Sequence, residues 1–238
     1  MRFRAATFNI RNGDAEDGLN SWRYRRSATV EMILSLDAGI IGLQEVLKDQ
    51  LDYILDSLPE YAYTGVGRID GSVEGEFAPI LYRRSEWAPL KSGWFMLSET
   101  PELAGSMSWN TACERICTWA TFPGITVFNT HLDHISGEAR LHGVELILSR
   151  VEGPALVMGD FNAQPSDSPI QTMLNSGFQD AGLGANEPTF HNWARGPGER
   201  IDYLFSNSAL LTGCHTHLNS PRGKMASDHF PVSAWVEL

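Results

Sequence analysis

The sequence is poor in lysine and carries a large surplus of acidic residues. Only three of its 18 basic residues are lysines, against 29 acidic residues, so its formal net charge is −11. A net negative field repels polyanions, which disfavours strong non-specific binding to duplex nucleic acid. The 15 arginines remain compatible with a small phosphorylated substrate, because a guanidinium group binds phosphate bidentately.

Cysteines and long apolar segments are also scarce. Cys113, Cys117 and Cys214 lack the paired spacing of zinc-binding cysteines, and their odd number favours reduced thiols. No segment approaches the roughly 20 consecutive apolar residues of a membrane span, and the first residues contain no long apolar run. We therefore expect a cytoplasmic protein without a membrane span.

The chain also lacks linkers, repeats and low-complexity segments. No Pro/Gly/Ser-rich stretch separates two halves, and no fixed period recurs. With 42% hydrophobic residues, 11 phenylalanines and 7 tryptophans, the sequence can form a sizeable core. We expect a single domain over residues 1–238.

Short apolar runs of strand length alternate with segments of helical spacing. The predicted strands are Arg4–Ile10, Gly39–Leu43, Ala78–Tyr82, Thr118–Phe122, Thr126–Asn129, Ala155–Met158, Ile201–Phe205 and Phe230–Val236. The predicted helices are Ser27–Leu36, Gln50–Leu58 and Glu138–Val151. This alternation indicates an α/β fold.

Two segments, Arg11–Asn20 and Arg68–Glu76, are predicted to be long loops. Both are rich in glycine and acidic residues. Loops on a rigid scaffold often carry binding groups, although any surface loop has similar polarity.

Polar residues that could carry chemistry gather at the ends of the predicted strands. They are Asn9, Glu45, His131, Asp133, Asp160, Asn162, Asp202, Asp228 and His229. Ligands of α/β sheets bind outside the carboxyl ends of strands, so these side chains can converge on one cleft. Side chains two residues apart in an extended chain project to the same side, so we expect the side chains of His131 and Asp133 to point the same way. We expect the same of Asp160 and Asn162, which have the same spacing.

The donor types in this set favour a hard cation. Carboxylate and amide oxygens suit Mg²⁺ or Mn²⁺, whereas zinc would require more histidine or cysteine. Taken singly, each residue has a simpler interpretation: an Asn or Asp can cap or turn the backbone, and a histidine can be a hydrogen-bonded core residue. Their joint occurrence at strand ends favours a shared site.

Six ordered blocks closely resemble the endonuclease/exonuclease/phosphatase superfamily, whose members include deoxyribonucleases, sphingomyelinases and deadenylases. The blocks are Thr7–Ile10, Gly42–Val46, Asn129–Asp133, Gly159–Ala163, Arg200–Tyr203 and Ser227–Val232. The segments Gly93–Pro101, Ser108–Asn110 and Arg115–Ala120 resemble a mostly bacterial branch with similarity to deadenylases. The resemblance implies an α/β (α+β) four-layer sandwich. Two mixed β-sheets would pack face to face with helices on both outer faces.

The resemblance also implies a role for each residue of the set. Glu45 resembles the principal metal ligand, with Asn9 and Asp228 as direct or water-mediated partners. Asp160 resembles the base that deprotonates water, and Asn162 the amide that orients the water or the phosphate. His131 and His229 resemble the pair that donates to phosphoryl oxygens, and Asp202 the carboxylate that holds His229.

Two further residues have an open interpretation. Glu76 resembles the family's acidic partner of the first histidine, but it could be a solvated loop charge. Arg115 could clamp a phosphate oxygen or form a surface ion pair.

The expected function is hydrolysis of a P–O ester bond of a phosphomonoester or phosphodiester with Mg²⁺ or Mn²⁺. Protonated histidine and metal would stabilise the charge that develops on the phosphoryl group. The alternative is a nuclease, either a deadenylase-like 3′-exonuclease or an endonuclease, because Trp22, Trp109 and Trp193 lie in predicted loops and could stack on bases. His191 is a further polar loop residue. A binding protein without catalysis would require a broken site, and every expected polar residue is present.

Overall fold

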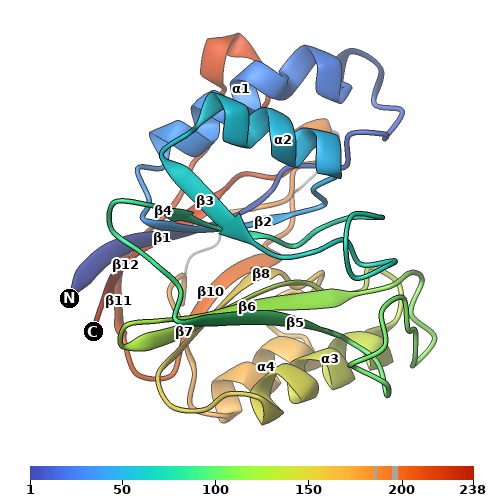
Figure 1. Ribbon diagram of the computed structural model, residues 1–238, viewed down its shortest axis with the longest axis vertical. Helices are drawn as coiled ribbons and strands as arrows, with labels where there is room; N and C mark the ends of the chain where they lie inside the picture. Colours follow the sequence, from blue (N-terminus) through green and yellow to red (C-terminus); the bar gives the residue numbers. More distant parts are fainter. Residues whose placement is uncertain (185–186, 195–197) are drawn as a thin grey trace.

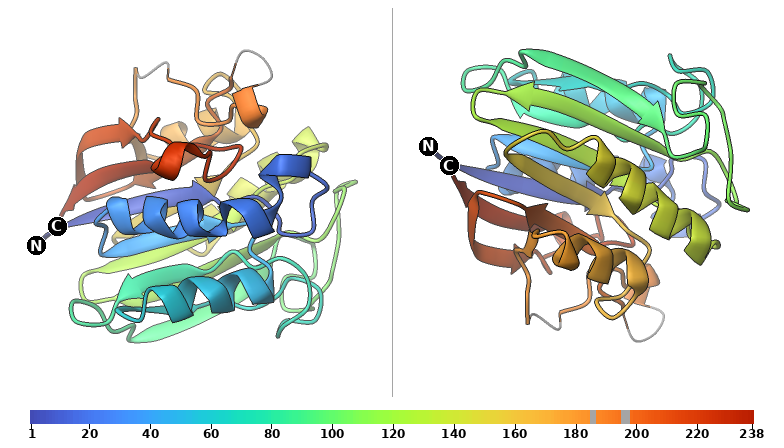
Figure 2. Two further views of the ribbon diagram at one scale, coloured as in Figure 1. Left: turned by 90° about the horizontal axis from the view of Figure 1, so that it is seen from above. Right: turned by 90° about the horizontal axis from the view of Figure 1, so that it is seen from below.

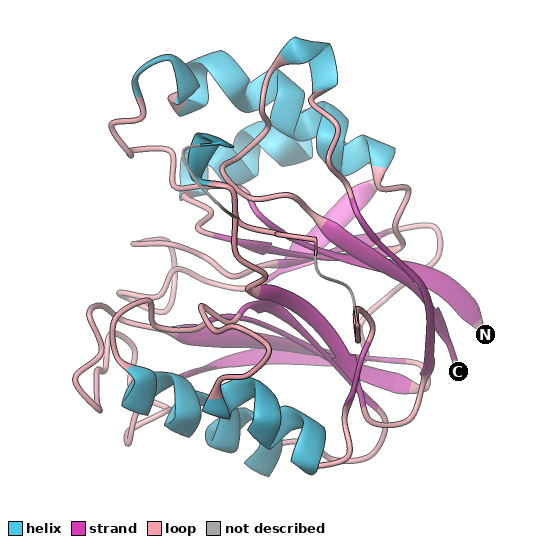
Figure 3. Cartoon of the chain, turned by 180° about the vertical axis from the view of Figure 1, so that it is seen from behind, coloured by secondary structure: helices cyan, strands magenta, loops and turns pink. Residues whose placement is uncertain are grey.

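The computed structural model describes residues 1–184, 187–194 and 198–238, and the chain forms four layers. Two β-sheets stack face to face (Figure 1). Helices α1 (Trp22–Ser35) and α2 (Lys48–Ser57) cover one outer face, and α3 (Gly137–Ser149) and α4 (Ser168–Asn175) cover the other. The view from behind shows the same order of layers (Figure 3). The four-layer sandwich expected from the sequence is confirmed.

The first sheet has the strand order β11-β12-β1-β2-β4-β3. Its strands are β1 (Arg2–Asn9), β2 (Ile40–Gln44), β3 (Tyr61–Thr64), β4 (Ile80–Arg83), β11 (Leu210–Thr216) and β12 (Val232–Glu237). β1 and β2 are parallel, and the other pairs are antiparallel. The sheet is therefore mixed, with a parallel pair at its centre.

The second sheet has the order β5-β6-β7-β8-β10-β9. Its strands are β5 (Lys91–Met96), β6 (Ile116–Phe122), β7 (Ile125–His131), β8 (Ala155–Asp160), β9 (Gln179–Asp180) and β10 (Asp202–Ser206). β7 and β8 are its parallel pair. The short 3-10 turns η1 (Gly18–Asn20), η2 (Asn192–Ala194) and η3 (Pro221–Gly223) lie in the connections.

The core between the sheets is mostly apolar but contains one hydrogen-bonded polar cluster. Gln44 Nε2 donates to Asn129 Oδ1 across the sheets at 2.7 Å, and Asn129 Nδ2 donates to the Leu43 carbonyl at 2.8 Å. A Cβ at Gly42 would lie 2.5 Å from Asn129 Oδ1, so glycine permits this close approach. The cluster holds β2 against β7 near their carboxyl ends, since Gln44 ends β2 and Asn129 lies two residues before the end of β7.

The first and last strands pair with each other, and the two chain termini lie side by side at one end of the sandwich (Figure 2). The Met1 amino group donates to the Leu238 carbonyl at 3.0 Å. Among the residues that the structure describes, no helix is long and apolar enough to cross a membrane.

Candidate active site

The strand directions bring the predicted site residues to one edge of the sandwich. Asn9 ends β1, and Glu45 follows the parallel strand β2. In the other sheet, His131 and Asp160 end the parallel strands β7 and β8 and pair with each other. Asp202 begins β10, which runs antiparallel to β8, and pairs with Asp160. The carboxyl ends of the parallel strands and the amino end of the antiparallel strand β10 therefore meet at this edge of the sandwich.

A cavity of about 410 Å³ opens at this edge. Eight of the predicted residues line it: Glu45, Glu76, Arg115, His131, Asp160, Asn162, Asp228 and His229. Asn9 and Asp202 are buried and do not line it, but each hydrogen bonds to a residue that does. Apart from Asp133, the residues of the set expected from the sequence are thus gathered at one place.

Asn9 joins the carboxylates of the two sheets. Its Nδ2 donates to Glu45 Oε1 at 3.0 Å and to Asp160 Oδ2 at 2.9 Å. Its Oδ1 accepts from the Arg11 backbone N–H at 2.9 Å. With its oxygen occupied in this way, Asn9 positions the carboxylates around it.

Glu45 is held in an uncommon backbone conformation. Its φ is 59°, and Arg11 (60°) and Asn162 (46°) share this left-handed region. Such residues cost about 1–3 kcal/mol each and cluster at functional sites. Burial raises the pKa of Glu45, but hydrogen bonds from Asn9 and from the Asn12 backbone N–H outweigh it. The pKa is lowered, so Glu45 is ionised.

Asp160 is a buried carboxylate with a raised proton affinity. Burial and the charge of Asp202 raise its pKa to about 7. Its Oδ1 accepts from the Asn162 backbone N–H at 2.9 Å, and its Oδ2 lies 3.5 Å from His131 Nε2 and 3.8 Å from His229 Nε2. These contacts place Asp160 at the centre of the polar cluster.

The two histidines differ in charge. Burial lowers the pKa of His229, but Asp202, 2.9 Å from Nδ1, and the more distant Asp160 raise it to about 10. Burial, Arg115 and Arg68 instead lower the pKa of His131 well below its ordinary value. At neutral pH these shifts favour a protonated His229 and a neutral His131, whereas the resemblance implied that both donate to phosphoryl oxygens.

The expected contact between Glu76 and His131 is absent. Glu76 Oε1 accepts from Asn12 Nδ2 at 2.7 Å, and its Oε2 forms an ion pair with Arg68. Within the described chain, His131 Nδ1 has no hydrogen-bond partner. The guanidinium of Arg68 competes for the carboxylate more strongly than a neutral imidazole, because it adds charge to the hydrogen bond.

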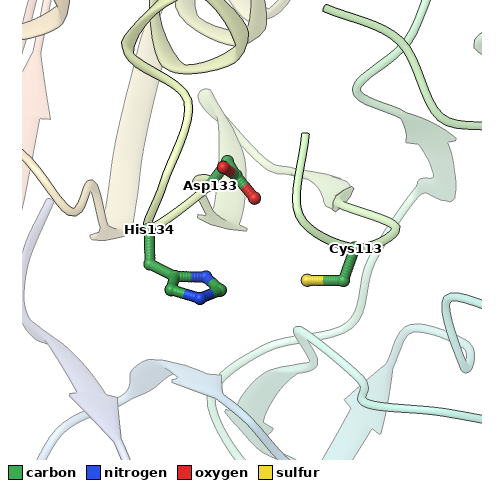
Figure 4. A group of neighbouring side chains, drawn as sticks. All are labelled: Cys113, Asp133 and His134. Atoms are coloured by element: carbon green, nitrogen blue, oxygen red, sulfur yellow. The ribbon is translucent and has the colours of Figure 1, made fainter. Parts of the chain in front are cut away.

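Arg115 is only 5% exposed and lines the cavity, so its interpretation as a surface ion pair is wrong. Its Nη2 lies 2.9 Å from His134 Nδ1, and its Nε lies 3.6 Å from Asp133 Oδ2. Figure 4 shows the thiol of Cys113 and the ring of His134 facing each other. One donor atom from each of Cys113, Asp133 and His134 lies within 4.8 Å of the others, but the adjacent guanidinium disfavours a second cation.

Asp133 does not share the direction of His131, contrary to the i,i+2 expectation. Its carboxylate accepts from the backbone N–H groups of Ala112, Ile135 and Ser136 at 2.6–2.9 Å. β7 ends at His131, so the alternation of strand side chains stops there. Asp133 holds loops together outside the cavity.

Several cavity residues were not predicted: Arg11, Asn12, Arg68 and His134. Arg11, Asn12 and Arg68 lie in the two segments that the sequence predicted to be polar loops. The polarity of these loops was the signal that could have pointed to them. Trp22 is buried in the core, Trp109 packs on His142, and Trp193 lies over Arg25. None of these tryptophans lines the cavity, and neither does His191.

The charges at this edge fit a divalent cation. The guanidinium of Arg11 lies 3.9 Å from Glu45 and 3.7 Å from Asp228. Asp160 and Asp202 add two carboxylates beside the imidazolium of His229, while Arg68, Arg115 and Glu76 line the same cavity. The carboxylate oxygens of Glu45 and Asp228 are donors that suit a hard divalent cation such as Mg²⁺ or Mn²⁺. Asp160, Asp202 and His229 form a second possible group within 4.8 Å, although His229 Nδ1 is already bonded to Asp202.

Comparison with known proteins agrees with this arrangement. The model of the Endonuclease/Exonuclease/phosphatase family matches residues 6–229. The chain belongs to this family. Members of the endonuclease/exonuclease/phosphatase family are hydrolases that act on phosphoester bonds and generally use a divalent metal. A search of the curated proteins found no match.

Solved structures extend the likeness over the whole chain. A family protein of Bacteroides vulgatus is 36% identical with a TM-score of 0.93, covering 100% of this chain and 99% of that one. A mannosyl-6-phosphatase of Bacteroides thetaiotaomicron is 30% identical with a TM-score of 0.88, covering 99% of each chain. D. rerio TDP2 complexed with single-strand DNA product is 17% identical with a TM-score of 0.74, covering 100% of this chain and 99% of that one, and shares the fold.

Proposed function

We propose that the protein is a divalent-metal-dependent phosphoesterase that hydrolyses a P–O ester bond of a small phosphorylated molecule. The observation that carries this proposal is the convergence of Glu45, Asp160 and His229 on one cavity. An ionised carboxylate, a carboxylate with a raised pKa and an imidazolium are the groups that this hydrolysis requires.

Glu45 and Asp228 would hold Mg²⁺ or Mn²⁺, with Asn9 positioning Glu45. The bound cation would polarise a phosphoryl oxygen and offset the charge that develops on the phosphate. The guanidinium of Arg11 lies between the same two carboxylates and would keep them from repelling each other before the cation binds.

Asp160 would accept the proton of the attacking water. A base acts best when its pKa is near the working pH, and the pKa of Asp160 is raised to about 7. The backbone N–H of Asn162 holds one carboxylate oxygen and so fixes its orientation. His229, kept cationic and oriented by Asp202, would donate to a phosphoryl oxygen.

A small substrate fits the cavity better than a polymer. The net charge of −11 opposes a long polyanion, and no tryptophan of the described residues offers a stacking surface there. Asn12, Asn192 and Glu199 at the cavity can hydrogen bond to hydroxyl groups. One relative is described as a mannosyl-6-phosphatase, so phosphorylated sugars are the first substrates to test.

We further propose that residues 1–238 act as one domain in the cytoplasm. All three cysteines are free thiols, which is the usual state in a reducing compartment. The site takes residues from both sheets, which supports one functional unit.

The test is a metal titration after removal of divalent ions with a chelator. We expect no turnover of a hexose 6-phosphate or of 4-nitrophenyl phosphate without metal, and recovery with Mg²⁺ or Mn²⁺. Glu45→Gln and Asp160→Asn should each lower kcat at least about 100-fold. Glu86→Gln removes an exposed carboxylate paired with Arg83 and should leave kcat unchanged.

Labelled single-stranded RNA and DNA serve as competing substrates in the same assay. Cleavage of nucleic acid at catalytic enzyme levels, without turnover of small esters, would identify a nuclease instead. Wild-type turnover by both Glu45→Gln and Asp160→Asn would refute the assigned roles.

A further inference from the structure

Two arginines line the cavity on the side of His131. Arg68 belongs to the loop between β3 and β4, and Arg115 immediately precedes β6. Both also share a small recess with His131, next to the main cavity. Segments far apart in the sequence therefore place two guanidinium groups beside one histidine.

Each guanidinium is oriented by a carboxylate that other donors already occupy. Glu76 binds Arg68 while also accepting from Asn12. Asp133, the carboxylate nearest to Arg115, accepts from backbone N–H groups at shorter distances than the 3.6 Å to Arg115 Nε. These carboxylates position the arginines without using all their N–H groups.

Donors of both arginines remain unused in the described protein. The Nε atoms of Arg68 and Arg115 are buried and have no hydrogen-bond partner. Only 5% of the surface of Arg115 is exposed. These Nε atoms are closed to solvent, so a ligand oxygen would be met by the Nη groups of the two side chains, which line the cavity.

His131 cannot supply positive charge on this side. Asn162 Nδ2, which can only donate, lies 3.0 Å from His131 Nε2. Nε2 therefore carries a lone pair, and the ring is neutral. The charge that a phosphate needs here must come from Arg68 and Arg115.

We propose that Arg68 and Arg115 form a guanidinium pair that binds a terminal oxygen of a phosphomonoester and makes the protein selective for monoesters over diesters. The proposal rests on the proposed function and names the substrate class of that site. A monoester carries three terminal oxygens and a charge of about −1.5 to −2 at neutral pH. In a diester, a second ester group replaces one terminal oxygen and removes its charge.

The two ester classes differ in what they present to this pair. Glu45 lines both the main cavity and the recess that it shares with Arg68, Arg115 and His131, so a phosphate held near Glu45 would also face the guanidinium pair. A monoester presents an anionic oxygen to the pair. A diester presents an uncharged substituent to two cations, so it gains little from them.

The experiment compares two esters across matched arginine variants. Arg68→Gln, Arg115→Gln and the double variant are assayed with 4-nitrophenyl phosphate and bis(4-nitrophenyl) phosphate in Mn²⁺. We expect kcat/KM for the monoester to fall about 100-fold in each single variant and kcat/KM for the diester to change less than about 5-fold. Arg140→Gln is the control, because Arg140 also has a buried, unpartnered Nε but does not line the cavity.

A second measurement does not depend on turnover. Calorimetric titration with inorganic phosphate in Mg²⁺ should show binding to the wild type and about 100-fold weaker binding to the double variant. Equal losses for monoester and diester, or unchanged phosphate binding, would overturn the proposal. If the wild type hydrolyses neither ester, the proposed function fails, and the phosphate titration still decides whether the pair binds an anion.

Discussion

The side-chain amide of Asn9 donates to Asp160 at 2.9 Å, from the end of β1 in one sheet to the end of β8 in the other. This hydrogen bond ties the two sheets together at the point where their polar residues meet. Asn9 is completely buried, so its N–H groups are aimed at carboxylates that solvent does not screen.

Replacing Asn9 with Asp should abolish the hydrogen bond from Asn9 to Asp160. The change exchanges two donors for a carboxylate in contact with Glu45 and Asp160, so we expect kcat/KM to fall at least about 100-fold. Asn207→Asp is the matched control, since the Asn207 side chain bonds to backbone away from the site. Steady-state kinetics on both variants check the prediction, and equal effects would contradict it.

Asp202→Asn should lower kcat more than it raises KM. Asp202 holds His229 Nδ1 at 2.9 Å and keeps the ring oriented and charged, which matters most in the transition state. We expect kcat to fall about 100-fold with KM within about 3-fold. Asp180→Asn, which breaks a buried pair with Arg200, two residues before the neighbouring strand β10, controls for a general loss of stability. A change in KM alone would contradict the assigned role.

Arg25→Met should destabilise the loops that carry the site. The guanidinium is 1% exposed and donates to four carbonyls, those of Ile10, Arg11, Asn20 and Ala226, at 2.5–3.1 Å. We expect a loss of roughly 3 kcal/mol or more in urea denaturation, because these carbonyls lose their partner. Arg4→Met removes one bond to the Leu36 carbonyl and should cost about 1 kcal/mol. Equal losses in the two variants would argue against this role for Arg25.

Asp133→Asn should change stability in a pH-dependent way. Burial raises the pKa of Asp133, but backbone N–H groups, led by Ser136 and Ala112, lower it to about 2. A carboxyl whose pKa is depressed on folding contributes stability above its unfolded pKa of about 4, and the contribution is lost as the pH falls through about 2.

The wild type should therefore exceed Asp133→Asn by about 2 kcal/mol in free energy of unfolding at neutral pH. The gap should shrink as the pH falls from about 4 to about 2, as measured by urea denaturation at several pH values. A gap that stays constant with pH would mean that the charge of Asp133 is not responsible.

The strands that the sequence predicted and those that it missed differ in position. All eight predicted strands are present, with shifted ends. The four that were missed, β3, β5, β9 and β11, are the edge strands of the two sheets. An edge strand has one partner and more exposure, so it lacks the continuous apolar run that marks a central strand. The short helix α4 was also missed, because eight residues give little periodicity.

The site residues divide in a similar way. Those whose positions follow from strand direction were predicted, and those whose positions depend on the path of a loop were not. Residues at strand ends, such as Glu45 and Asp160, could be predicted because strand direction places them. Arg68 could not, because its position depends on the path of a loop and on an ion pair with Glu76. Asp133 was misplaced for a related reason, since the chain leaves the extended conformation after His131.

The order of the strands along the chain determines when the proposed site can first assemble. The first sheet begins with β1 and is completed only by β11 and β12, after the whole second sheet. Asp228 and His229 directly precede β12. A chain that stops before these residues contains Glu45 and Asp160 but lacks Asp228, His229 and β12, so the proposed site cannot assemble until this last strand of the first sheet has been made.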